Sequence, residues 1–148
     1  ILDGGTSQIG LESTVINLYG KIQILRPGDI TREKISNILK KKISILKKTK
    51  ELRSPGLLKK HYSPGIPIKL NCEKADKKTA FLVFGKKYKK SKNVFNLSVK
   101  GNLKEAAKNL YKTLRKIKNL GFKKINVSKI PNNKIGIAIN DRLRKAAY

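Results

Sequence analysis

The chain has 148 residues and a hydrophobic share of 39%, enough for one modest core or two small units. Its 36 Lys and Arg residues against 9 Asp and Glu residues give a formal net charge of +27. No apolar run approaches the roughly 20 residues of a membrane-spanning helix, so we expect a soluble protein. The single cysteine, Cys72, excludes an internal disulfide and favours a reducing, cytoplasmic compartment.

A charge of this size attracts polyanions such as RNA through counterion release. Only six of the 36 basic residues are arginines, which leaves 30 lysines. Nucleic-acid-binding surfaces usually gather arginine and aromatic side chains in a patch. Two interpretations stay open: the compositional drift of an AT-rich genome, and a functional surface that faces RNA.

The chain begins at Ile1 and contains no methionine. A native N-terminus normally carries methionine or a targeting segment. We therefore expect the C-terminal portion of a longer protein, with processing or a deliberate cut as the alternative.

The first 50 residues predict a β-hairpin followed by a helix. Residues 14–18 and 21–25 are β-rich runs separated by Tyr19-Gly20, which indicates closely spaced strands. Thr31 can cap a helix that continues to about Leu46. The apolar residues expected on one face of this helix are Ile35, Ile38, Leu39 and Leu46.

Residues 53–64, Arg-Ser-Pro-Gly-Leu-Leu-Lys-Lys-His-Tyr-Ser-Pro, form a segment that we call the strap. Its two prolines fix φ and push the preceding serines out of the helical region, so the strap is expected to be extended. Its cationic groups and phenol suit closure over a phosphate-bearing ligand. His61, the only histidine, is interpreted as a structural hydrogen-bonding residue rather than a general base.

The second half predicts alternating strands and helices. Strands are expected at 66–70, 79–84 and 124–128, and a solvated lysine-rich loop is expected at 86–93. Asn102 and Glu105 resemble a capping box before a helix that ends at Gly121, and a last helix is expected at 137–147. The apolar positions of the first helix are Leu103, Ala106, Ala107, Leu110, Leu114 and Ile117. This order favours a small α/β layer with parallel strands.

Two short motifs near the N-terminus could bind an anion. Asp3-Gly4-Gly5 and the Gly10-Leu-Glu-Ser-Thr-Val15 block combine glycines with the hydroxyl groups of Ser13 and Thr14, although such a stretch is also typical of an ordinary turn. Arg26 places a guanidinium at a strand end, where a surface salt bridge is the alternative. Cys72 is expected to be inert, and no protein metal site is expected. Asp141-Arg142 is expected to form an ion pair or a helix cap.

Four blocks together carry a family resemblance. They are Gly10-Leu-Glu-Ser-Thr-Val15, Leu25-Arg-Pro-Gly28, Ser54-Pro-Gly with His61-Tyr-Ser-Pro64, and Gly136-Ile-Ala-Ile-Asn-Asp-Arg-Leu143 with Ala146-Ala147. In this order they resemble the long form of the threonylcarbamoyl-AMP synthase family. That form has a YrdC-like catalytic domain and a C-terminal accessory domain.

The resemblance implies an activity and several site residues. Members of the family convert ATP, L-threonine and bicarbonate to threonylcarbamoyl-AMP and pyrophosphate, for threonylcarbamoyladenosine modification of tRNA by a transfer machinery. It implies that Ser13 contacts L-threonine, and that Arg26 and Tyr62 contact ATP. Mg²⁺ is expected on the phosphates of ATP. No catalytic side chain is implied, and the Asn-Asp-Arg-Leu block is given no substrate contact.

The resemblance also implies a fold with a missing part. We expect an α/β chain: the truncated end of a YrdC-like domain at 1–50, an extended linker at 51–66, and a small Rossmann-like accessory domain with a mainly parallel sheet at 67–148. The basic ATP-gripping block of the family is absent, so the chain is expected to be inactive without an N-terminal part. A non-catalytic basic RNA-binding module and a decayed gene product remain as alternatives.

Overall fold

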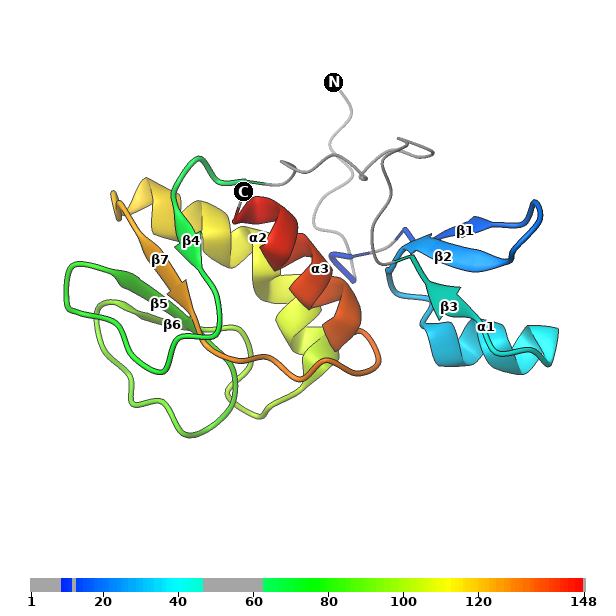
Figure 1. Ribbon diagram of the computed structural model, residues 1–148. Helices are drawn as coiled ribbons and strands as arrows, with labels where there is room; N and C mark the ends of the chain where they lie inside the picture. Colours follow the sequence, from blue (N-terminus) through cyan, green and yellow to red (C-terminus); the bar gives the residue numbers. More distant parts are fainter. Residues whose placement is uncertain (1–8, 12, 47–62, 148) are drawn as a thin grey trace, which may run out of the picture.

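The computed structural model describes residues 9–11, 13–46 and 63–147. Within these residues the chain forms two separate β-sheets, the first accompanied by one helix and the second by two (Figure 1). We call residues 9–46 the N-terminal unit and residues 63–147 the C-terminal unit. The expected domain boundaries at 50 and 66 stay a prediction.

The N-terminal unit has a three-stranded sheet in the order β1-β2-β3. β1 (Val15–Asn17) and β2 (Gln23–Arg26) pair antiparallel, which confirms the predicted hairpin. The side chain of Asn17 holds the turn between them, because its Nδ2 donates to the carbonyl oxygens of Tyr19 and Lys21 at 2.7 and 3.1 Å. The short strand β3 (Ser44–Ile45) adds to β2 in parallel.

The helix of the N-terminal unit is shorter than predicted. α1 (Arg32–Leu39) begins after Thr31, whose side chain accepts a hydrogen bond from the N–H of Lys34, as expected for an N-cap. It ends at Lys40, which adopts the left-handed conformation (φ 50°) that usually falls to glycine. The predicted extension to Leu46 is wrong, because the chain turns at Lys40 and re-enters the sheet as β3.

The predicted apolar face of α1 is also mostly wrong. Ile35 is buried, but Ile38 is 77% exposed and Leu39 is half-exposed. The core of the N-terminal unit consists of Ile24, Ile35 and Ile43, with three partly buried isoleucines against it. Five of the seven large apolar side chains that are exposed in the described residues belong to this unit. They are Leu18, Tyr19, Ile30, Ile38 and Leu39.

The C-terminal unit is a parallel α/β layer, as predicted. Its sheet has the order β4-β7-β5-β6, and every neighbouring pair is parallel. The strands are β4 (Ile68–Lys69), β5 (Ala80–Val83), β6 (Val94–Asn96) and β7 (Ile125–Val127). α2 (Leu103–Asn119) connects β6 to β7, and α3 (Gly136–Ala146) follows β7. The sequence did not predict β6, which is short and only partly buried.

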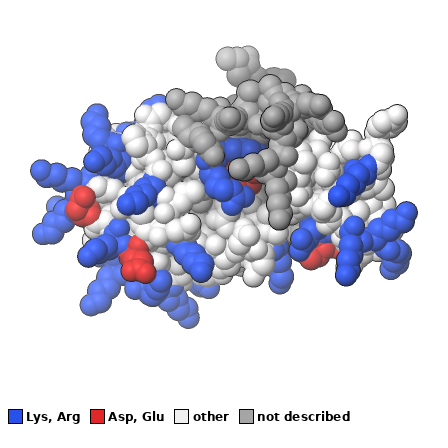
Figure 2. Space-filling model, in the orientation of Figure 1, with Lys and Arg blue, Asp and Glu red and all other residues white. Residues whose placement is uncertain are grey.

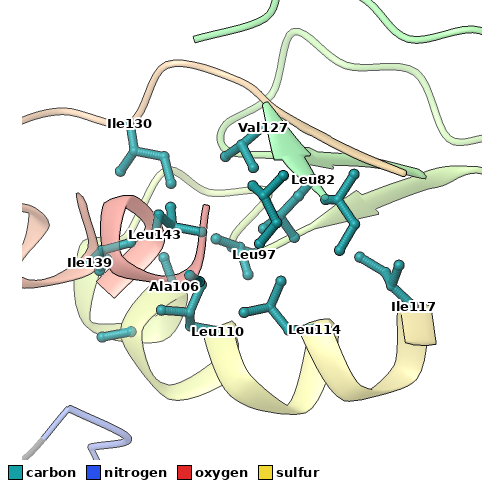
Figure 3. Close-up of a cluster of buried hydrophobic side chains, with 14 of the residues drawn as sticks. Leu82, Leu97, Ala106, Leu110, Leu114, Ile117, Val127, Ile130, Ile139 and Leu143 are labelled. Atoms are coloured by element: carbon teal, nitrogen blue, oxygen red, sulfur yellow. The ribbon is translucent and has the colours of Figure 1, made fainter. Parts of the chain in front are cut away.

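The main core lies between this sheet and the helices α2 and α3 (Figure 3). The predicted apolar face of α2 is confirmed: Ala106, Ala107, Leu110, Leu114 and Ile117 are buried. Facing residues of the strands, such as Leu82 and Val127, complete the cluster (Figure 3). None of the helices that the structure describes is long and apolar enough to cross a bilayer.

The start of α2 departs from the predicted capping box. Asn102 caps the helix by accepting hydrogen bonds from the N–H groups of Lys104 and Glu105. The N–H of Asn102 donates to the hydroxyl of Ser98 at 2.9 Å, and this hydroxyl donates to the carboxylate of Glu105. Ser98 therefore stands between the two partners of the box, and it joins the end of β6 to the first turn of α2.

Candidate functional site

The structure brings two predicted site residues, Ser13 and Arg26, to the same end of the β1–β2 pair. Val15 of β1 pairs directly with Arg26, the last residue of β2, and Ser13 lies two residues before Val15. Ser13 is exposed and Arg26 is half-buried. Residues that carry a hydroxyl and a guanidinium thus lie at the same end of two paired strands.

The pairing of β1 and β2 is irregular at this end. Its register shifts between Val15 and Ile16, which pair with Arg26 and Ile24, so Leu25 is an extra residue on β2. Both Ile24 and Leu25 are buried, although strict alternation would bury only one of them. A bulge of this kind changes the direction of the side chain that follows it. Here the residue that follows is Arg26.

The turn after Arg26 packs tightly on the backbone of Ser13. A Cβ atom added to Gly28 would lie 2.5 Å from the carbonyl carbon and oxygen of Ser13 and 2.6 Å from the nitrogen of Thr14. Glycine is therefore needed at position 28 because the backbones of the two segments approach closely there, and not because the position has a positive φ. The hydroxyl of Thr14 donates to the carbonyl oxygen of Ile30 at 2.9 Å, which ties the same two segments together a second time.

A buried arginine of the C-terminal unit also binds this turn. Arg142, on α3, is 4% exposed, and its Nη2 donates to the carbonyl oxygen of Pro27 at 3.0 Å. Its Nη1 pairs with Asp141, which also accepts from Lys145 at 2.9 Å. The predicted Asp141-Arg142 ion pair is present. Nothing in the sequence indicated the link between Arg142 and the Arg-Pro-Gly turn.

The segment before Ser13 rests on the C-terminal unit as well. Gly10 has a φ of 83°, and a Cβ atom there would lie 2.7 Å from the carbonyl oxygen of Ala107 on α2. Leu11 is buried in the main core. The Gly10-to-Val15 block therefore starts against α2 and ends in the N-terminal sheet.

The remaining site predictions fall on the Asp3-Gly4-Gly5 motif and on the strap. This motif, and Tyr62, His61 and Arg53 of the strap, lie outside the described residues. Among the residues that are described, no group of three His, Cys, Asp or Glu side chains lies close enough to hold a metal ion.

Comparison with known proteins identifies the family of this chain. Residues 30–148 match the family described as threonylcarbamoyl-AMP synthase, C-terminal domain. The chain belongs to this family. The resemblance carried by the four sequence blocks is therefore confirmed.

Relatives in the threonylcarbamoyl-AMP synthase family match almost the whole chain. The protein of Pyrococcus abyssi is 31% identical over 168 residues and that of Bacillus subtilis 30% over 173 residues, each covering 99% of this chain and 48% of the relative. The Schizosaccharomyces pombe protein is 30% identical over 181 residues, with 44% of its length covered. The chain thus spans about half the length of the relatives that it matches.

Solved structures agree with the fold. The crystal structure of P. abyssi Sua5 complexed with L-threonine superposes with a TM-score of 0.81 at 29% identity, over 98% of this chain and 48% of that one. A doubly substituted variant of P. abyssi Sua5 gives a TM-score of 0.77 at 26% identity, over 98% and 47%. The α/β class and the parallel sheet of this threonylcarbamoyl-AMP synthase domain are therefore those of known family members.

Proposed function

We propose that this chain is the C-terminal part of an L-threonylcarbamoyladenylate synthase that serves tRNA modification. The complete enzyme would convert ATP, L-threonine and bicarbonate to threonylcarbamoyl-AMP and pyrophosphate. The observation that carries the proposal is that Ser13 and Arg26 lie at the same end of the paired strands β1 and β2, in a chain of this family.

The chemistry asks for positioning and charge neutralisation rather than for a nucleophilic side chain. An amine is carboxylated, the new carboxylate attacks the α-phosphate of ATP, and pyrophosphate leaves. In this proposal Arg26 forks onto phosphate oxygens and Ser13 orients the polar groups of L-threonine. Tyr62 of the strap contacts the nucleotide, and Mg²⁺ arrives bound to the phosphates of ATP.

The N-terminal unit has a small core and several exposed apolar side chains, as expected of a unit that packs against another part of the protein. The separate core of this unit contains three buried side chains, whereas the main core contains nineteen, of which only Leu11 comes from this unit. Its exposed apolar side chains, such as Tyr19 at 92% and Ile38 at 77%, belong to a hairpin turn and a helix face. We propose that the part of the relatives that this chain does not match covers these side chains, and that the chain alone is inactive.

A reconstitution experiment tests the proposal. Pyrophosphate release would be measured with ATP, L-threonine and bicarbonate, for the chain alone and for the chain mixed with the N-terminal half of a related synthase. Activity is expected only in the mixture. Sustained turnover by the chain alone would contradict the need for a second part, and an inactive mixture in which the two parts bind each other would contradict the enzymatic role.

Substitutions in the mixture test the individual residues. Arg26→Ala and Tyr62→Ala are each expected to lower kcat/KM for ATP by roughly tenfold or more, because each removes a contact to a charged ligand. Ser13→Ala is expected to raise the KM for L-threonine. Arg32→Ala and Ser44→Ala, at exposed positions of the same unit, are the matched controls. Equal effects of site and control variants would remove the assignment.

The surface charge supports a second candidate, a basic RNA-binding module. Figure 2 shows lysine and arginine side chains spread over the visible face of both units, with few acidic ones among them. Such a surface binds tRNA with a strong salt dependence. Salt-sensitive tRNA binding, together with no ATP-dependent activity in any reconstituted mixture, would favour this candidate over the synthase.

A further inference from the structure

A hollow of about 240 Å³ lies at the carboxyl ends of β4 and β7, neighbouring parallel strands at one edge of the C-terminal sheet. It is bordered by Leu70 and Asn71 after β4, by residues that follow β7, and by α3. Ser13 and Arg26 are not among its lining residues. The hollow is therefore distinct from the part of the predicted substrate site that Ser13 and Arg26 represent.

The chain leaves β4 and β7 toward opposite faces of the sheet. After β4, Asn71 takes a left-handed conformation (φ 56°), and the following loop passes over the face away from the helices, where Asn126 Nδ2 donates to the carbonyl oxygen of Lys74 at 3.0 Å. After β7 the chain continues into α3, on the helical face. Open α/β sheets bind ligands in the crevice at such a switch point.

The lining of the hollow is cationic and polar over an apolar floor. Lys129 and Arg144 are exposed and border it, and no Asp or Glu is among its lining residues. The floor includes Val127 and Leu143, which belong to the main core. A lining with two cations and no carboxylate suits an anionic ligand.

One buried hydroxyl in this lining has no partner among the described residues. Ser128 is 1% exposed, and its Oγ makes no hydrogen bond there, although its backbone N–H donates to the carbonyl oxygen of Leu82 at 2.9 Å. Buried hydroxyl groups almost always have a partner, and a buried group without one is unfavourable. An acceptor atom of a ligand in the hollow would supply that partner.

A second donor in the lining is the side-chain amide of an asparagine. Asn140 Nδ2 donates both to the carbonyl oxygen of Ile130 and to Asn132 Oδ1, at 3.2 Å each. Because its oxygen is used in this way, Asn132 has its Nδ2 as the remaining polar atom, and both asparagines line the hollow. Residues with hydroxyl, amide, ammonium and guanidinium donors therefore line one space, and this set of donors suits the several oxygens of a phosphate group.

We propose that this hollow binds the phosphate group of a small metabolite. Its volume far exceeds the roughly 10–15 Å³ that one water needs, and it falls below the roughly 300–1,000 Å³ typical of sites for drug-sized ligands. The ligand is therefore smaller than a nucleotide. Lys129 and Arg144 neutralise its charge, and Ser128 and Asn132 donate to its oxygens.

The test is an NMR titration of the ¹⁵N-labelled 148-residue chain with inorganic phosphate at constant ionic strength. Saturable shifts are expected at the amides of Asn71, Ser128 and Asn132, with AMP binding no more tightly than phosphate. Shifts spread over the lysine-rich surface without saturation would overturn the proposal. Tighter binding of AMP than of phosphate at the same amides would overturn the size argument.

Three variants with two matched controls complete the test. Arg144→Gln and Lys129→Gln are each expected to weaken phosphate binding by roughly tenfold, whereas Arg115→Gln and Lys116→Gln, exposed on α2, are expected to leave it unchanged. Ser128→Ala should weaken binding several-fold without lowering the unfolding midpoint of the phosphate-free chain. Equal effects of site and control variants, or a loss of stability without a loss of binding in Ser128→Ala, would contradict the assignment. This readout does not depend on synthase activity.

Discussion

Arg142 and Pro27, 115 residues apart in the sequence, are joined by a buried hydrogen bond of 3.0 Å from the guanidinium to the carbonyl oxygen. The donor belongs to α3 of the C-terminal unit, and the acceptor lies in the turn that follows Arg26. The same turn packs on the backbone of Ser13. The C-terminal unit thus helps to fix the position of two predicted substrate contacts.

Removing this guanidinium should destabilise the N-terminal unit first. Arg142→Met is expected to lower the free energy of unfolding by about 1–3 kcal/mol, because the buried carbonyl of Pro27 loses its donor. Urea unfolding measures the loss, and hydrogen exchange should show faster exchange at residues 23–28 than at β5. Arg115→Met, exposed on α2, is the control and should change stability by less than about 0.5 kcal/mol. Equal stability of the two variants would show that the bond contributes nothing.

The contact between Gly28 and Ser13 gives a second prediction. Gly28→Ala places a methyl group 2.5 Å from the backbone of Ser13, so the two segments must separate, at a cost of about 1–3 kcal/mol. NMR should show shifted amides at Ser13 and Thr14, and the reconstituted enzyme should show a higher KM for L-threonine. Gly20→Asn is the control, since its position has open space and a φ of 64° that asparagine tolerates. Unshifted amides in Gly28→Ala would contradict the packing.

Local pattern was sufficient to predict the elements whose burial is periodic. The buried run around β5 and the apolar face of α2 are long enough to identify from the sequence, and Gly121 (φ 79°) marks the end of α2 as expected. The end of α1 could not be predicted, because Lys40 takes a left-handed conformation with no glycine to indicate it. β6 was missed because its three residues follow a lysine-rich loop.

In the candidate site, contacts between residues close in the sequence could be predicted, and contacts between distant residues could not. The hairpin placed Ser13 near Arg26, since a tight turn at Tyr19-Gly20 brings the ends of both strands together. The hydrogen bond from Arg142 could not be predicted, because nothing in the sequence near Pro27 indicates a donor on the last helix. The hollow beside Ser128 exists because β7 lies next to β4 in the sheet, although the two strands are far apart in the sequence. This strand order is known only from the assembled sheet.

The N-cap of α2 gives a third prediction. Asn102→Ala removes the acceptor of two backbone N–H groups and is expected to cost about 1 kcal/mol. For a unit of this size, 1 kcal/mol corresponds to a midpoint about 4–8 °C lower in a thermal melt followed by circular dichroism. Lys100→Ala, exposed two residues earlier, should melt with the parent chain. A melt of Asn102→Ala that coincides with both would mean that Ser98 alone suffices to start the helix.

The pH dependence of the C-terminal unit gives a fourth prediction, centred on Asp76. The hydroxyl of Thr79, which donates to this carboxylate at 3.0 Å, is the main cause of a pKa below the usual value. Desolvation opposes the effect, and the N–H of Lys78, 2.8 Å from the other oxygen, adds to it. Because the folded pKa is the lower one, this interaction stabilises the fold above the unfolded pKa of about 3.9 and is lost as the pH falls through the folded pKa.

Thr79→Val keeps the shape of the buried side chain and removes its donor. The pKa of Asp76 is then expected to rise toward its usual value, measured by the ¹³C shift of its carboxyl carbon during an acid titration. Stability should also depend less steeply on pH in the acid range, because less of a pKa difference remains between the folded and unfolded chains. Thr113→Val on α2 should leave the titration of Asp76 unchanged. An unaltered pKa in Thr79→Val would assign the shift to the N–H of Lys78 instead.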